Sequence, residues 1–120
     1  MRRILASSFL TTALLTSMAA CSSEDSGAVE VNGETVILDV RTPAEYAVGH
    51  LEGVRLLDFN GGEFFEAIPG LDPVPEYLLY CRSGARSAAA AEILEVAGFH
   101  TANLGSLEEA AVRTGINIVS

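Results

Sequence analysis

The stretch Tyr77–Ser87, Tyr-Leu-Leu-Tyr-Cys-Arg-Ser-Gly-Ala-Arg-Ser, is the part of the sequence from which the fold can be deduced. A hydrophobic run ends at Cys81 and an alanine-rich segment follows within a few residues, which predicts a strand, a tight turn and a helix. Because the N–H groups in the first turn of a helix have no helical partners, such a turn directs N–H groups towards the residue that ends the strand. We therefore expect a ring of N–H groups that stabilises negative charge on Cys81.

Cys81 is the candidate nucleophile of this turn. A helix N-terminus and nearby guanidinium groups lower the pKa of a thiol, and Arg82 and Arg86 follow Cys81 closely in the sequence. The deprotonated form is the reactive form of cysteine. Gly84 supplies the conformational freedom that a tight turn needs. The sequence thus predicts a Cys81 thiol that is substantially deprotonated near neutral pH.

Three motifs resemble those of the rhodanese (thiosulfate sulfurtransferase) family. The spacing from Cys81 to Arg86 is Cys-x4-Arg, and residues 39–46 and 49–54 match family motifs in order and spacing. The resemblance spans residues 36–119 and implies an α/β fold, in which a small, mainly parallel β-sheet is flanked by α-helices on both faces. It departs from the family pattern at residues 105–107, where Gly-Ser-Leu replaces a common Gly-Gly pair, and the chain has no tryptophan. Because of this departure, the resemblance does not define the pocket wall or the identity of the substrate, whereas the assignment of Cys81 is unaffected.

Sulfur transfer is the activity that the resemblance implies. Cys81 would take a sulfane sulfur from a small anionic donor such as thiosulfate, become a persulfide, and pass the sulfur to cyanide or a thiol without a cofactor. Related phosphatases have Cys-x5-Arg, in which the extra residue fits a phosphate, so phosphatase and arsenate reductase chemistry are disfavoured. A non-catalytic or persulfide-carrier binding module is the alternative. The implied substrate-binding loop comprises Arg82, Ser83, Gly84, Ala85, Arg86 and Ser87.

Residues that follow the first buried strand are expected to support this loop. Asp39 lies near the carboxyl end of a strand predicted at 36–40, where it is placed to steady an arginine or an N–H group of the Cys81 loop. Thr42 and the proline after it predict a helix start. We expect Arg41 and Glu45 to form an ion pair that braces this turn.

The two histidines do not indicate a metal site or a general base. His50 and His100 are fifty residues apart, and neither they nor Cys81 have the short spacing that is typical of metal ligands. We expect His50, within Gly-His-Leu-Glu-Gly, to hydrogen-bond to the backbone where the chain turns back to the sheet. No metal is therefore predicted.

The remaining elements follow from periodicity and turn residues. Asn32-Gly33 predicts a small hairpin between residues 28–31 and 34–37. The helix at 85–97 is expected to bury Ala89, Ile93, Val96 and Ala97. Further expected elements are a strand at 54–59, a helix at 63–68, a loop at 71–76, a strand at 100–104 and a capped helix at 106–113.

The N-terminal segment has the features of an export signal. Residues 1–20 combine two arginines with an apolar stretch, and small residues precede Cys21. This arrangement is similar to a bacterial lipobox, which implies a signal peptide at 1–20, lipidation of Cys21, a polar linker over 21–28 and a domain over 29–120. The alternative is an ordinary cleaved signal peptide in which Cys21 has no role. With lipidation, the protein would be anchored to a bacterial membrane on the periplasmic or cell-surface side.

Composition limits the class of protein and its partners. A chain of 120 residues allows one small domain, and its formal net charge is −9. Loss of Arg2 and Arg3 with the signal would make this charge −11, which is unsuited to binding nucleic acid. All positive side chains are arginines or histidines, and two arginines lie in the Cys81 loop. We expect a monomer whose substrates are attracted by local charge.

Overall fold

The computed structural model describes residues 27–120. The predicted signal peptide, the lipidation of Cys21 and most of the linker lie outside the described residues. Within the described part, no helix has the length and apolar character that crossing a membrane requires.

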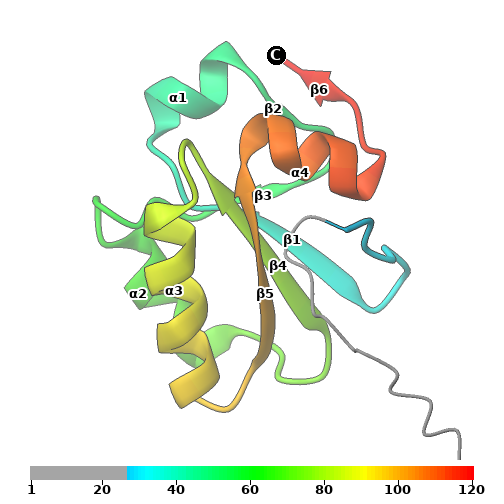
Figure 1. Ribbon diagram of the computed structural model, residues 1–120. Coiled ribbons are helices and arrows are strands. Elements are labelled where there is room, and N and C mark those ends of the chain that lie inside the picture. Colours follow the sequence, from blue (N-terminus) through cyan, green and yellow to red (C-terminus); the bar gives the residue numbers. More distant parts are fainter. Residues whose placement is uncertain (1–26) are drawn as a thin grey trace, which may run out of the picture.

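A four-stranded parallel sheet forms the centre of the domain, in the order β3-β1-β4-β5 (Figure 1). The strands are β1 (Thr35–Asp39), β3 (Arg55–Leu56), β4 (Glu76–Cys81) and β5 (His100–Ser106). The helices are α1 (Pro43–Val48), α2 (Glu63–Ala67), α3 (Ala85–Val96) and α4 (Leu107–Thr114), with a 3-10 turn at Ile68–Gly70. The predicted mainly parallel α/β architecture is confirmed. Since β4 lies between β1 and β5, its carboxyl end is flanked by neighbours on both sides.

A second, two-stranded sheet lies next to the first. It pairs β2 (His50–Leu51) with β6 (Ile118–Val119) in antiparallel register. This pairing brings residues 118–119 close to the end of α1, because His50 pairs with Val119 and Leu51 with Ile118. The small sheet therefore contributes one side of the surface near the carboxyl end of β4.

Helices cover both faces of the central sheet, as predicted (Figure 1). Alternate residues of β4 point to opposite faces, so that Leu79 and Cys81 join the core under α2 and α3, whereas Leu78 and Tyr80 join the core under α4. Continuous burial from residue 77 to residue 81 is the pattern of a parallel strand that is covered on both sides. Cys81 is thus fixed by a strand whose residues 77–81 are buried on both faces.

At the edges of the domain one expected feature is wrong and another is only partly confirmed. Asn32 does form a turn, with its C=O accepting from Thr35 N–H at 3.1 Å, but residues 28–31 form no strand. Instead, Val29 N–H donates to Arg113 C=O at 2.9 Å, which ties this segment to the end of α4. The strand expected at 54–59 is limited to Arg55–Leu56.

The buried face of α3 also differs from the expected one. Its buried residues are Ser87, Ala90, Ala91 and Leu94, whereas Val96 is 86% exposed. The run of four alanines has no hydrophobic periodicity, so the face could not be recognised from the pattern. The consequence for the site is that Ser87, a polar residue, faces the sheet directly beneath the Cys81 loop.

Helix α1 begins as predicted. Thr42 is the N-cap and its hydroxyl accepts from Glu45 N–H at 3.2 Å, while the Glu45 carboxylate accepts from Thr42 N–H at 3.3 Å, which completes a capping box. Pro43 occupies the first helical position. The cap fixes Glu45 at the end of α1 that faces the carboxyl end of β4.

Candidate active site at the carboxyl end of β4

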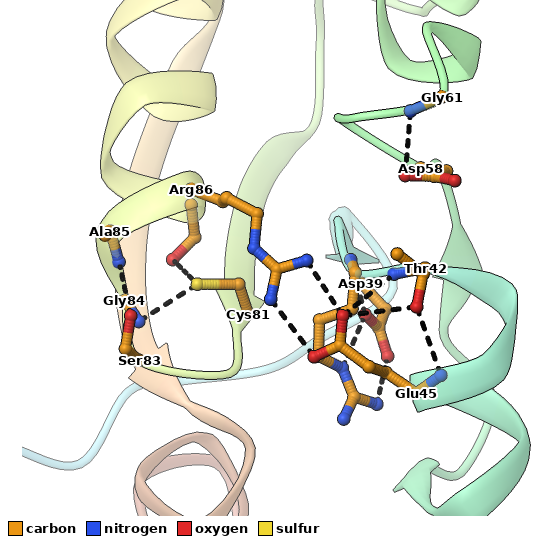
Figure 2. A network of polar contacts seen from close by, with 12 residues as sticks. Asp39, Thr42, Glu45, Asp58, Gly61, Cys81, Ser83, Gly84, Ala85 and Arg86 are labelled. Carbon is orange, nitrogen blue, oxygen red and sulfur yellow. Dashed lines mark hydrogen bonds and ion pairs between the residues drawn. The ribbon is translucent and has the colours of Figure 1, made fainter.

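Cys81 ends β4, and the loop that follows turns back towards its sulfur. Gly84 N–H donates to Cys81 Sγ at 2.9 Å, and Ser87 Oγ lies 3.5 Å from the same sulfur (Figure 2). Helix α3 begins at Ala85, so Gly84 and Ser87 belong to the N-cap and the first turn. The predicted strand, turn and helix around Cys81 are confirmed, and the sulfur lies where helix N–H groups converge.

The surroundings of Cys81 lower the pKa of its thiol. The residue is fully buried, and burial alone raises the pKa of a thiol by removing water from the anion. The Ser87 hydroxyl and the N–H groups of Ser87, Gly84 and Ser83 act in the opposite direction and outweigh burial. The net effect is that hydrogen bonds of the loop favour the thiolate.

Gly84 is required by the geometry of this loop. Its φ of +95° lies in the left-handed region, and a Cβ atom added there would lie 3.1 Å from the Cα of Gly105 on β5. The close approach of the loop to β5 is therefore possible only with glycine at position 84. Ala85 and Ser83 are exposed, and Ser83 Oγ accepts weakly from Ala85 N–H at 3.4 Å.

Arg86 reaches across the site to α1. Its two terminal nitrogens contact the two carboxylate oxygens of Glu45 at 2.9 and 3.1 Å (Figure 2). This bidentate pair, together with hydrogen bonds from Thr42, lowers the pKa of Glu45 to about 2. The same pairing raises the pKa of Arg86, to which the negative charge of Cys81 also contributes. Arg86 thus holds α3 against α1 and places a positive charge near the sulfur.

The predicted ion pair between Arg41 and Glu45 is wrong. Arg41 pairs with Asp39, donating from Nε and a terminal nitrogen at 2.9 and 2.7 Å, while the same terminal nitrogen donates to Gly49 C=O at 2.6 Å. Tyr80 O–H donates to the Asp39 carboxylate at 2.8 Å. Asp39 therefore steadies an arginine of its own turn, and the expectation that it contacts an arginine or N–H group of the Cys81 loop is not met.

This buried network connects β1 to β4. Asp39 and Tyr80 are fully buried and form a registered pair of the parallel sheet, and Arg41 is 5% exposed. The phenol oxygen of Tyr80 also accepts from Leu51 N–H at 3.1 Å, which links the network to β2. Burial raises the pKa of the Tyr80 phenol well above its ordinary value. The network fixes the direction of β4 immediately before Cys81.

A cavity of about 420 Å³ lies beside the loop at Arg82. Arg82 is exposed, and no ion-pair partner for it occurs among residues 27–120. Apolar side chains from three elements form much of the wall, and Val48 is 84% exposed. The lining residues are Arg41, Glu45, Val48, Gly49, Arg82, Leu107, Glu108 and Ile118. The cavity therefore combines one free cation with apolar surface.

His50 has the structural role expected from the sequence. Its Nδ1 lies 2.8 Å from Tyr46 C=O, and its ring stacks on the Tyr46 ring at 3.6 Å between centroids. No cluster of three or more histidine, cysteine or acidic side chains is arranged to hold a metal within residues 27–120.

Two residues of the site were missed by sequence reasoning. Tyr80 was interpreted only as part of a hydrophobic strand, yet its hydroxyl completes the Asp39 network. Asn103 was interpreted only as part of the last strand, yet its amide contacts Gly84 C=O at 3.0 Å and Ser87 Oγ at 2.7 Å. A polar group inside a predicted strand was the available signal, because such a group needs a hydrogen-bond partner wherever the strand is covered.

Comparisons with known proteins agree with this geometry. A family model described as the rhodanese-like domain matches residues 26–109. A Bacillus subtilis protein, YtwF, named as a candidate sulfurtransferase, is 33% identical over 76 residues, which are 63% of this chain and 72% of YtwF. MoeZ of Mycobacterium tuberculosis, named as a candidate adenylyltransferase/sulfurtransferase, is 36% identical over 72 residues, which are 55% of this chain and 17% of MoeZ.

Solved structures are similar over the same part of the chain. A structure described as rhodanese with anions from E. coli is 28% identical, with a TM-score of 0.61, and covers 72% of this chain and 98% of its own. A rhodanese-related protein from Thermoplasma volcanium is 27% identical, also with a TM-score of 0.61, and covers 72% of this chain and 84% of its own. From the matched domain and these relatives, the chain belongs to the rhodanese-like domain family.

Proposed function

We propose that the protein is a sulfurtransferase that carries sulfane sulfur on Cys81. The observation that carries this proposal is the convergence of loop N–H groups on the Cys81 sulfur, with Gly84 N–H at 2.9 Å. These groups stabilise a negative charge without a metal. Sulfurtransferase names among the relatives support the same reaction class.

The reaction begins with attack of the Cys81 thiolate on the outer sulfur of a donor such as thiosulfate. A sulfur–sulfur bond forms to Cys81, the sulfur–sulfur bond of the donor breaks, and sulfite leaves with the bonding electrons. The terminal sulfur of the resulting persulfide carries the negative charge. An acceptor such as cyanide then attacks the terminal sulfur, and thiocyanate leaves while the Cys81 thiolate is regenerated.

Arg86 and Arg82 are suited to different steps of this cycle. Arg86 is held by Glu45, so its charge remains in place beside the sulfur while substrates exchange. Arg82 is exposed at the cavity and is available to contact an anionic donor. Because Cys81 is fully buried, transfer requires a local opening of the exposed loop residues Arg82 and Ser83, while the Glu45–Arg86 pair stays in place.

The test is an intact-mass measurement after incubation with thiosulfate. The full chain should gain one sulfur atom, Cys81→Ser should gain none, and the matched variant Cys21→Ser should gain one as the wild type does. Addition of cyanide should remove the sulfur and release thiocyanate. Equal masses for wild type and Cys81→Ser would refute the proposal, and consumption of a phosphomonoester in a parallel assay would favour phosphatase chemistry instead.

A persulfide-carrier module is the second candidate. Full burial of Cys81 favours it, since a buried persulfide is shielded from small acceptors in solution. The two functions differ in turnover: a sulfurtransferase forms thiocyanate continuously with excess thiosulfate and cyanide, whereas a carrier would keep the sulfur on Cys81 and form no thiocyanate.

Export and lipid anchoring at Cys21 are part of the proposal for the whole chain. They rest on the sequence of residues 1–21 alone. The mass of the protein isolated from membranes of a producing bacterium would show loss of residues 1–20 and addition of lipid at Cys21. A mass without lipid, with cleavage at the same bond, would favour the ordinary signal peptide.

A further inference from the structure

The amide of Asn103 on β5 has a single possible orientation. Its Nδ2 lies 3.0 Å from Gly84 C=O, which can only accept a hydrogen bond, and its Oδ1 lies 3.0 Å from Gly105 N–H, which can only donate. Exchanging the nitrogen and the oxygen would therefore place two acceptors together and two donors together. The Asn103 Oδ1 atom is consequently the one that faces Ser87, at 2.7 Å from its hydroxyl oxygen.

This orientation determines where the proton of Ser87 lies. A hydroxyl has one proton, and Asn103 Oδ1 can only accept, so at 2.7 Å the Ser87 proton points to Asn103. The lone pairs of Ser87 then remain for the Cys81 thiol, whose sulfur is 3.5 Å away. When the sulfur is anionic, the hydroxyl has to rotate and donate to it, and Asn103 Oδ1 keeps only Gly105. Ser87 is fully buried, so water does not readily supply a substitute partner.

We propose that Asn103 is a positioning residue for Cys81 and acts by holding the proton of Ser87 whenever the Cys81 sulfur is uncharged. Two stages of the proposed cycle have an uncharged Sγ: the protonated thiol, and the persulfide, in which the charge lies on the terminal sulfur. Asn103 accepts the proton in both stages and releases it when Sγ becomes a thiolate. The buried hydroxyl thus has an acceptor throughout, and the same amide holds the loop through Gly84.

This role rests on the proposed function only for its effect on turnover. The competition between Asn103 Oδ1 and the Cys81 sulfur for the Ser87 proton takes place before any sulfur donor is bound. Asn103 stabilises the protonated state by accepting from Ser87, so its removal shifts the equilibrium towards the thiolate. The Gly84 carbonyl also accepts from Ala88 N–H at 3.0 Å, so loss of the Asn103 amide does not leave this buried carbonyl without a donor.

The experiment is a pH titration of the thiol in the full chain, with Cys21→Ser in every sample so that Cys81 is the only cysteine. The ultraviolet absorbance of the thiolate and the rate of alkylation by iodoacetamide both report its pKa. Asn103→Ala should lower the pKa of Cys81 by about one unit, the size expected for the net contribution of one hydrogen bond between neutral groups. Asn103→Leu, which has a similar shape and also lacks the acceptor, should lower the pKa by the same amount.

Ser87→Ala removes the donor and should also raise the pKa of Cys81. In the Ser87→Ala background, Asn103→Ala should have no further effect, because the proton that Asn103 held is absent. The exposed Asn60→Ala variant is the matched control and should leave the pKa unchanged. If Asn103→Ala does not fold, Asn103→Leu, which fills more of the space of the side chain and also removes the acceptor, supplies the test together with Ser87→Ala.

Either of two results would overturn the proposal. One is an unchanged pKa in both Asn103 variants, and the other is the same shift for Asn103→Ala with and without Ser87. The titration is measured without donor, so it can agree with the proposal even if Cys81 accepts no sulfur. Conversely, sulfur uptake by Cys81 with a titration that is independent of Asn103 would refute only the role of Asn103.

Discussion

Two ion pairs involve residues at or next to the turn between β1 and α1, namely Asp39–Arg41 and Glu45–Arg86, and they differ in how far they are buried. The Asp39–Arg41 pair has side-chain exposures of 0% and 6% and lies within the buried network of Tyr80. The Glu45–Arg86 pair has exposures of 25% and 23% and crosses to the loop that holds Cys81. The comparison teaches that an arginine near an active site can serve mainly the fold or mainly the site, and that burial distinguishes the two roles.

The buried pair should be more important for stability. Asp39→Asn keeps the shape of the side chain but leaves Arg41 charged and buried without a counter-ion, which costs about 3–5 kcal/mol. That is a large part of the free energy of unfolding of a small domain, about 5–15 kcal/mol. Urea unfolding followed by circular dichroism measures the change. A loss below 1 kcal/mol would show that the buried pair is not the main support of this turn.

The partly exposed Glu45–Arg86 pair should contribute less to the free energy of unfolding, and its contribution should depend on pH. Glu45→Gln should lower the free energy of unfolding by about 1 kcal/mol at pH 7, since water screens this pair. The folded pKa of Glu45, about 2, lies below its ordinary value of 4.5. Its stabilisation is therefore complete above pH 4.5 and is lost as the pH falls towards 2.

Unfolding of wild type and Glu45→Gln at several pH values tests this dependence. The difference between the two proteins should shrink steadily between pH 4.5 and 2. A difference that stays constant over this range would mean that the ion pair with Arg86 does not set the ionisation of Glu45.

The smallest effect on stability is expected for Arg82, which lines the cavity and has no counter-ion among residues 27–120. Arg82→Gln should change the free energy of unfolding by less than about 0.5 kcal/mol, because the side chain is exposed. It should raise the KM for thiosulfate about fivefold, which corresponds to about 1 kcal/mol for an exposed charge contact. Arg55→Gln, an exposed arginine on β3 outside the cavity, is the control. Equal KM values for the two variants would contradict a donor contact at Arg82.

Local features of the site were predictable from the sequence. The end of a strand at Cys81, the need for glycine at position 84 and the Thr42 cap each depend on a few neighbouring residues, and each was predicted correctly. Backbone preferences act over this short range, so the sequence pattern carries the information.

The side chains with which Glu45, Arg41 and Asn103 form ion pairs or hydrogen bonds could not be predicted from the sequence in the same way. Glu45 is four residues from Arg41 but pairs with Arg86, which is 41 residues away, because the parallel strands β1 and β4 bring the starts of α1 and α3 to the same edge of the sheet. The role of Asn103 likewise depends on the parallel pairing of β4 with β5. The burial of α3 was ambiguous for another reason, since four consecutive alanines present similar surfaces in every direction. These features depend on tertiary structure, which a single sequence records only indirectly.

The adjacent residues Tyr80 and Cys81 of β4 point to opposite sides of the sheet. Tyr80 belongs to the core under α4, and Cys81 belongs to the core under α3. Inserting or deleting one residue inside this strand would exchange the phenol and the sulfhydryl, and would disable both the Asp39 network and the proposed nucleophile. Length changes in the proline-containing connection before the strand, residues 71–75, would leave that alternation intact. Natural variation in the length of this segment is therefore expected to concentrate before Glu76 and to be absent between Tyr77 and Cys81.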